Sequence, residues 1–186
     1  MKKLATMLKI AAVMAVALFL GGGCDDGIDW VGLSRVNFAV DNEVLICYDL
    51  TNKFRTSGTA DYKTEDGGTK RVGKLNPLTL DEELCKAAAI RAEEIVENFA
   101  HERPDGRECF TVLDDLGIKA NGKGENIAAG NKSGEKTFLQ WKEDNKDYNG
   151  QGHRRNMLGN FTKIGLAYTY APNSTYKYYW VMILAN

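Results

Sequence analysis

The chain has 186 residues, a length typical of one globular domain with a tail. Hydrophobic residues make up 44% of it, and it contains three tryptophans, which is enough for a sizeable core and excludes wholesale disorder. The formal net charge is −1, but residues 1–23 carry three lysines and no acid. The remaining 21 basic and 25 acidic residues give residues 24–186 a net charge of −4. A mildly acidic domain is a poor candidate for binding nucleic acid through its phosphates.

Residues 1–23 have the pattern of a secretory signal peptide. Two lysines open the chain, an apolar run of 11 residues covers Ile10–Leu20, and three glycines follow. The run is too short to span a bilayer as a mature helix, which needs about 20 residues. Cys24 comes next and resembles the lipidated cysteine of bacterial lipoproteins, although the usual large apolar residue is displaced by one place to Leu20. We expect lipidation of Cys24 and a spacer over 24–37, with ordinary secretion as the alternative.

Three further cysteines, Cys47, Cys85 and Cys109, leave the disulfide question open. Export permits a disulfide, but an odd number leaves one thiol over, and the sequence does not say which pair forms. Their spacings match no zinc finger. Nothing in the local sequence marks one of them as a catalytic nucleophile.

The early part of the domain is predicted to be helical. Asp41 begins a helix that Gly58 ends, because apolar residues recur between them near the helical period. Residues 59–76 are polar and rich in glycine, which predicts a loop with a short hairpin. Thr79 and Glu82 form a capping-box pattern at the start of the clearest helix.

That clearest helix ends near His101, and two shorter helices are predicted after it. One covers residues 110–116 and is closed by Gly117; the other is capped by Ser133. The apolar residues that define the inward faces of these helices are Leu80, Leu84, Ala87, Ala88, Ile95, Phe99, Phe138 and Trp141.

The end of the chain changes to strand patterns. Lys163–Tyr170 alternates between apolar and polar residues, and Tyr178–Leu184 is aromatic and β-branched. The turn residues Pro172–Ser174 separate them, which predicts an antiparallel hairpin. The whole pattern predicts one mixed domain with helices packed against a sheet.

Three segments carry side chains that are suited to metal binding or catalysis. Phe99–Gly106 places His101 just past a helix end. Gly124–Ala128 reads Gly-Glu-Asn-Ile-Ala. Trp141–Asp144 is followed by Gly152–Leu158, which contains the chain's second and last histidine, His153.

These segments resemble the CAP superfamily, which comprises cysteine-rich secretory proteins, insect venom allergens, plant pathogenesis-related proteins and many bacterial exported proteins. The resemblance runs from about residue 38 to 186 and includes the closing strands. It implies an α+β fold, a three-layer α-β-α sandwich with a central antiparallel sheet. It also implies a cleft that holds two histidines and two acidic residues.

His101, Glu125 and His153 match three of the four cleft positions of the family. For the fourth, the resemblance favours Asp144, with Glu143 as the alternate. Imidazole is the commonest metal ligand, and two histidines with one carboxylate form a known ligand set for zinc. His101 and His153 are therefore the candidate ligands for zinc or another divalent cation, and Glu125 and Asp144 are the candidate catalytic residues. The alternative is that both rings are surface or structural groups.

Other polar and aromatic residues are predicted to be structural. Trp141 and Trp180 are expected in the core, since large aromatics dominate core burial. Asn126 is expected to hydrogen-bond the loop beside Glu125. Arg154 and Arg155 are expected on a solvated face rather than against an anionic ligand.

The function that we favour is a binding or interaction protein of the cell envelope or extracellular space, anchored to the membrane through Cys24. Its partner would be a protein, peptide or lipid. One alternative is a metal-dependent hydrolase acting on peptides or envelope components, with Glu125 as general base. Others are a lipid- or sterol-binding protein and a structural envelope protein with a vestigial cleft. No nucleophile motif is present, which favours binding over catalysis.

Overall fold

The computed structural model describes the backbone of residues 36–38 and the whole of residues 41–186. The predicted signal peptide, Cys24 and most of the spacer lie outside the described residues. Within the described part, no helix is both long enough and apolar enough to cross a bilayer.

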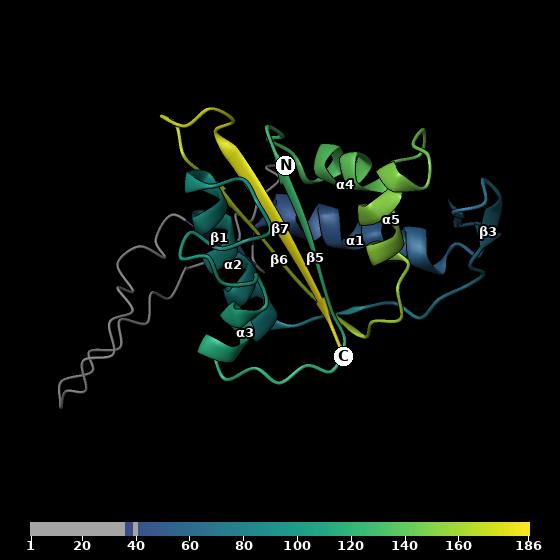
Figure 1. The fold of residues 1–186 in the computed structure, drawn as a ribbon, viewed down its shortest axis with the longest axis horizontal. Coiled ribbons are helices and arrows are strands. Elements are labelled where there is room, and N and C mark those ends of the chain that lie inside the picture. The colour runs from purple at the N-terminus through teal and green to yellow at the C-terminus, as the bar shows by residue number, and fades with distance from the viewer. Residues whose placement is uncertain (1–35, 39–40) are drawn as a thin grey trace, which may run out of the picture.

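A mostly antiparallel sheet forms the middle layer (Figure 1). Its main strands run in the order β1 (Val36–Phe38), β6 (Lys163–Tyr170), β7 (Tyr178–Ala185) and β5 (Lys123–Ala129). The two-residue β4 (Thr79–Leu80) pairs with β6 in parallel. The predicted hairpin of β6 and β7 is therefore confirmed, and it forms the centre of the sheet.

Helices cover both faces of this sheet, because the side chains of β7 alternate between two apolar clusters. Its odd-numbered residues, such as Val181 and Ile183, pack with α2 (Glu82–Glu97) and α3 (Thr111–Asp115). Its even-numbered residues belong to the second cluster, with α1, α4 and α5. That second cluster takes residues from Asn42–Thr56 (α1), Gly134–Lys142 (α4) and Gly152–Met157 (α5). The predicted three-layer α-β-α sandwich is confirmed.

Helix α2 lies unusually close to the sheet at Gly165 of β6. A Cβ atom placed on Gly165 would lie 2.1 Å from the carbonyl carbon of Leu84, far inside van der Waals contact. Glycine at this position therefore allows the backbone of α2 to pack directly on the backbone of β6.

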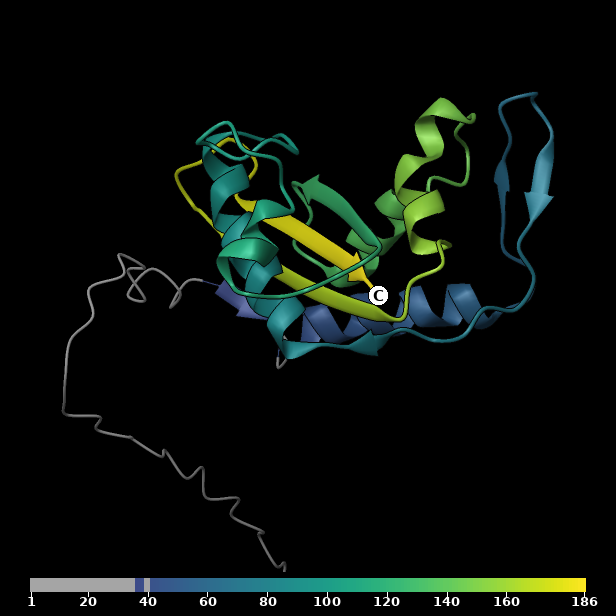
Figure 2. The same ribbon diagram turned by 60° about the horizontal axis from the view of Figure 1, so that its bottom comes forward.

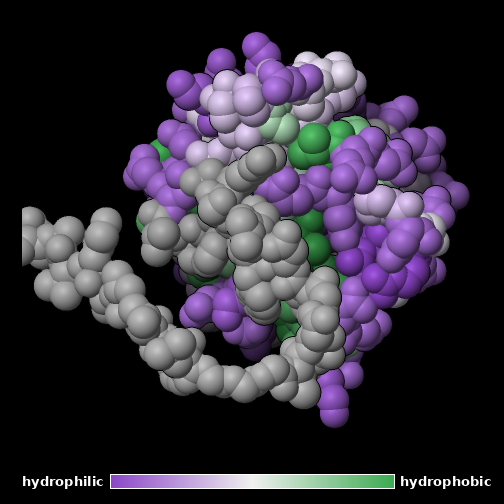
Figure 3. All heavy atoms as spheres, turned by 90° about the vertical axis from the view of Figure 1, so that its left-hand side faces the viewer, coloured by the Kyte–Doolittle hydropathy of each residue, from purple (hydrophilic) through white to green (hydrophobic). Residues whose placement is uncertain are grey.

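Figure 3 shows the side of the molecule where α2 and β1 lie, and its visible surface is mainly hydrophilic with small apolar patches.

The hairpin predicted within residues 59–76 is present and stands apart from the main sheet (Figure 2). Its strands are β2 (Asp61–Lys63) and β3 (Thr69–Arg71). It is held to the short 3-10 helix η2 (Asn149–Gln151), because the backbone N–H of Lys63 donates to the side-chain oxygen of Gln151 at 2.6 Å.

The predicted helix starts are confirmed at two places and wrong at one. Asp41 and Ser133 cap α1 and α4 through their side-chain oxygens. Thr79, however, does not cap α2: it belongs to β4, and its N–H donates to the carbonyl of Thr162. The cap is Asp81, whose carboxylate accepts from the N–H of Leu84 at 3.1 Å. Pairing with β6 competes successfully with the capping box for the backbone of Thr79.

Trp141 and Trp180 are fully buried, as predicted, whereas Phe99 is 45% exposed. All three cysteines of the domain are buried, and Cys47 and Cys109 are free thiols. Strand β5 and helix α5, which carry the Gly-Glu-Asn and Gly-His-Arg segments, are elements that the sequence patterns do not predict.

Candidate functional site

His101 and Glu125 are in direct contact. The Nδ1 atom of His101, in the loop after α2, lies 2.8 Å from Oε1 of Glu125 on β5. The imidazole is 58% exposed while the carboxylate is only 2% exposed. Because a carboxylate accepts, Nδ1 carries the proton and Nε2 is the nitrogen left towards solvent.

Arg91, in the middle of α2, holds both members of this pair. Its Nε donates to Oε2 of Glu125 at 2.9 Å, and its Nη2 donates to the backbone carbonyls of Ala100 and His101. Its Nη1 is paired with Glu94 on the next turn of α2. A fully buried guanidinium therefore sets the position of the His101 backbone and of the carboxylate that orients its ring.

A second imidazole–carboxylate pair lies on α5. The Nδ1 atom of His153 is 2.6 Å from Oε1 of Glu143, whose other oxygen accepts from the N–H of Arg154. Glu143 follows α4 directly and has a left-handed backbone with φ of 51°. Non-glycine residues adopt this conformation at a cost of about 1–2 kcal/mol, and here it turns the carboxylate towards α5.

In this structure Glu143, the alternate, therefore lies beside His153, and the favoured residue Asp144 does not. Asp144 pairs with Lys142 and Arg154, at 2.7 Å each. It lines a different cavity, between α1 and α4. The chain turns back sharply at Glu143, so that consecutive carboxylates face different neighbours.

Arg154 is predicted from the sequence to lie on a solvated face, and that prediction is wrong. The residue is 5% exposed and its guanidinium donates to the carboxylates of Asp61 and Asp144 and to the carbonyl of Lys142. It joins α5 to α4 and to the β2–β3 hairpin. It is a structural residue that supports the loop carrying Glu143.

Amide side chains link the Glu125 segment of β5 to α5, which carries His153. Asn126, beside Glu125, donates to the backbone carbonyl of His153 at 3.1 Å. Asn156 donates to the carbonyl of Glu125 and to the side-chain oxygen of Asn126. Asn126 therefore contacts α5 rather than a loop beside Glu125. These bonds fix α5 on β5 and bring His153 to the same place as His101.

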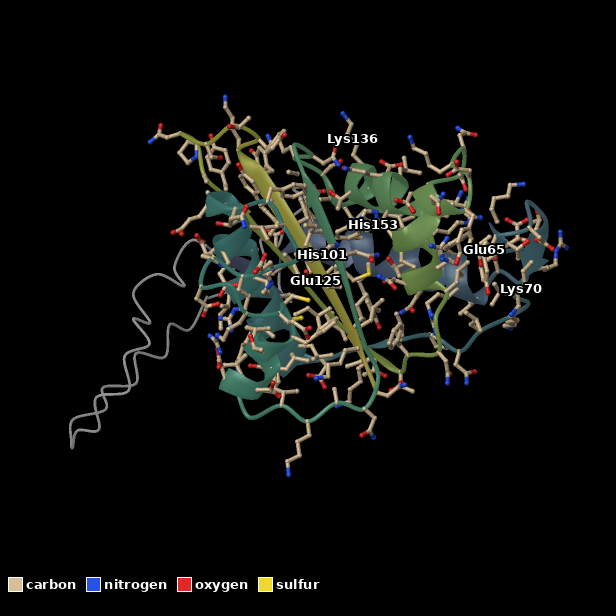
Figure 4. All side chains as sticks on the ribbon, viewed as in Figure 1. Glu65, Lys70, His101, Glu125, Lys136 and His153 are labelled. Carbon is tan, nitrogen blue, oxygen red and sulfur yellow. The ribbon has the colours of Figure 1, made fainter. Side chains whose placement is uncertain are left out.

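Both pairs line one cavity of about 360 Å³. Figure 4 shows His101, Glu125 and His153 gathered over β5 and α5, far from Glu65 and Lys70 on the hairpin. The residues that line it are His101, Glu125, Glu143, Asn149, Gly150, Gly152, His153, Arg155 and Asn156. The three residues predicted by resemblance are therefore together, with Glu143 as their fourth neighbour.

The carboxyl group of Glu125 is held as a carboxylate. Burial on its own would raise its pKa, but hydrogen bonds from His101 and Arg91 outweigh burial and lower the pKa. The thiol of Cys109 also bonds to it, and burial followed by this neighbour raises the pKa of that thiol to about 12. Cys109 is thus a protonated, buried thiol and a poor nucleophile.

The side chains of the pocket include two imidazoles that could serve as metal ligands. Among residues 41–186, no group of three or more histidine, cysteine and acidic side chains is arranged as a ligand set. Two imidazole Nε2 atoms remain, and each ring is held through Nδ1 by a carboxylate. This is the pairing that orients histidines in metal sites.

Comparison with known proteins identifies the family of this chain. Residues 48–184 match the model of the CAP family, described as the cysteine-rich secretory protein family. The chain belongs to the CAP family. A curated relative, the uncharacterized protein YkwD of Bacillus subtilis, is 36% identical over 97 residues. That match covers 50% of this chain and 35% of YkwD, so this chain matches about a third of that relative's length.

Solved structures agree on the fold of the CAP domain. An extracellular SCP-domain protein of Bacillus anthracis has a TM-score of 0.56 and 22% identity, over 77% of this chain and 40% of its own. An outer surface protein of Borrelia burgdorferi has a TM-score of 0.57 and 14% identity, over 81% and 97%. A cysteine-rich secretory protein of Staphylococcus aureus has a TM-score of 0.51 and 16% identity, over 77% and 38%.

Sequence reasoning about the CAP domain missed Arg91 altogether. Its position on the inward face of α2, among alanines, is a signal that could have found it. A charged residue at a core position of a helix requires a buried partner. The sequence offers several acids, however, and does not say that Glu125 is the one.

Proposed function

We propose that this chain is an exported CAP-domain binding protein of the cell envelope or extracellular space. We further propose that its pocket takes a divalent metal ion such as zinc on His101 and His153. The observation that carries the metal proposal is the pair of imidazoles with Nδ1 bonded to carboxylates, which leaves each Nε2 for a ligand. Relatives described as extracellular and outer-surface proteins support export.

Hydrolysis with Glu125 as general base is less well supported. A general base needs a free oxygen within reach of a water and a pKa near the working pH. Glu125 is 2% exposed, its oxygens already accept from Arg91 and His101, and its pKa is lowered. These contacts support a positioning role for the carboxylate.

Zinc titration of the purified exported chain tests the metal proposal. We expect calorimetry to show one zinc ion bound per chain, and no binding in His101→Ala/His153→Ala. Lys136→Ala, on the outer surface of α4 (Figure 4), is a control that should bind as the unchanged chain does. Equal binding by the double variant would overturn the metal proposal.

Membrane anchoring through Cys24 is a separate proposal with its own test. We expect Cys24→Ser to move the protein from the membrane fraction to the soluble exported fraction. An unchanged membrane fraction would refute lipidation at this residue and would leave the pocket unaffected.

A second candidate function, binding of a lipid, is favoured by another cavity. This cavity of about 400 Å³ lies between α1 and α4, and its apolar walls include Phe54 and Phe138, whose rings are 6.1 Å apart. Lys53 and Lys142 also line it. Leu50 of α1 also lines this cavity. Binding of a fatty acid that is lost in Leu50→Glu but kept in His101→Ala/His153→Ala would establish this function. Binding that Leu50→Glu does not affect would exclude this cavity.

A further inference from the structure

Arg155 lines the histidine pocket and is held there in a defined orientation. Its guanidinium carbon lies 4.2 Å from the centre of the Tyr148 ring, a stacking distance, and its Nη1 donates to the backbone carbonyl of Tyr148. A stacked guanidinium with one anchored nitrogen keeps its plane fixed. The remaining N–H groups are therefore presented in a pre-set geometry.

Arg155 has no carboxylate partner among the described residues, in contrast to Arg154 beside it and to most of the other described arginines. Arg91, Arg103, Arg107 and Arg154 each form an ion pair with aspartate or glutamate. Arg155 forms none with residues 41–186, and the only hydrogen bond of its side chain there is the one to Tyr148. Its guanidinium is thus left without an ion-pair partner in that part of the chain.

The two carboxylates of the pocket do not cancel this charge for a ligand. Glu125 is 2% exposed and paired with Arg91, and Glu143 is 12% exposed and bonded to His153. Glu125 is therefore compensated by Arg91, and Glu143 is largely withdrawn from solvent, with both of its oxygens already accepting hydrogen bonds from His153 and the N–H of Arg154. An incoming molecule meets two imidazoles and one guanidinium.

We propose that Arg155 is a specificity-determining residue that selects a ligand carrying a carboxylate group. The guanidinium matches a planar carboxylate with two parallel hydrogen bonds, and such charge-assisted pairs are about twice as strong as neutral ones. A cavity of about 360 Å³ has room for a small organic acid or the carboxyl-terminal residue of a peptide. This inference rests on the proposed function only in that the same pocket is the binding site.

The test uses a matched pair of probes on the exported chain, with a chelator present. N-acetylalanine carries the carboxylate, and N-acetylalaninamide has the same shape without the charge. We expect N-acetylalanine to shift the backbone amide resonances of His153 and Asn156 saturably in NMR spectra, and the amide probe to give no saturable shift. We expect Arg155→Gln to weaken binding of the acid about tenfold, the loss of one charge-assisted pair.

Two further variants keep the test decisive. Arg71→Gln removes the same charge from the exposed β3 strand, outside the pocket, and should bind like the unchanged chain. Arg155→Lys keeps the charge but loses the planar fork, so binding between the two extremes is expected. Equal shifts from acid and amide, or undiminished binding by Arg155→Gln, would overturn the proposal. Zinc binding is measured in a separate titration without chelator. Failure of the zinc proposal and failure of the carboxylate proposal can therefore be told apart.

Discussion

Arg91 and Glu125 form an ion pair that water does not reach. Their Nε and Oε2 atoms are 2.9 Å apart, and their side chains are 0% and 2% exposed. The pair joins α2 to β5, and through the carbonyl of His101 it also holds the loop that presents the first imidazole. A buried ion pair contributes little net stability compared with apolar packing, but the loss of one partner leaves an uncompensated charge. The main effect of the pair is therefore to fix the positions of α2, β5 and the His101 loop relative to one another, rather than to add net stability.

Removal of Arg91 should be costly. We expect Arg91→Met to lower the free energy of unfolding by about 3–5 kcal/mol, because Glu125 would remain buried without its cation. Urea unfolding at neutral pH measures this. Arg107→Met, which breaks exposed pairs with Asp105 and Asp115, should cost far less. If both variants lost the same stability, burial of the Arg91–Glu125 pair would not make its loss more costly than the loss of an exposed pair.

The stability of the domain should depend on the ionisation of Glu125. Its pKa is lowered in the folded state relative to about 4.3 in an unfolded chain. The unfolded state therefore binds the proton more readily, so the stabilisation is complete above that pH and is lost as the pH falls through the folded pKa. Urea unfolding from pH 6 to about pH 3 should show a smaller decline in Glu125→Gln than in the unchanged chain. Parallel curves would contradict this prediction.

Glu143 and Asp144 provide a matched comparison of adjacent acids. If the pocket binds zinc, Glu143→Gln should weaken binding about 10–100-fold, since second partners of metal-binding histidines have effects of this size. Asp144→Asn should leave zinc affinity within error, because Asp144 contacts Lys142 and Arg154 instead. Nitrogen NMR of the His153 ring gives a second measurement, and it should change only in Glu143→Gln. The reverse order of effects would favour Asp144 over Glu143 as the acid that supports His153.

Gly165 should tolerate no side chain. We expect Gly165→Ala to destabilise the domain by about 1–3 kcal/mol or more, because its new Cβ would collide with the backbone of Leu84. Gly152→Ala is the control: among the described residues, no atom beyond its own stretch of helix lies within 4 Å of the place its Cβ would take, and alanine favours the helix there. Thermal unfolding of both variants checks this. Equal melting temperatures would show that α2 can move away from β6.

Much of the fold was readable from local patterns. The apolar periodicity of α2, the capping by Asp41 and Ser133, and the alternating strand β6 all depend on hydrogen bonds and side-chain directions within a few residues. The order of the three chemistry-bearing segments, compared with the family, was enough to select His101, Glu125 and His153. These three residues do line one pocket.

What the sequence by itself determined was therefore most of the helices, the β6–β7 hairpin and the identity of three pocket residues, whereas strand β5 and helix α5 were not predicted. Only the tertiary structure decided which partner each one has. Arg91 is 34 positions from Glu125, and their pairing follows from the packing of α2 on the sheet. The left-handed turn at Glu143, which separates it from Asp144, is imposed by contacts with α5. Such partners come from segments that are distant in the chain, so local secondary-structure propensity cannot predict them.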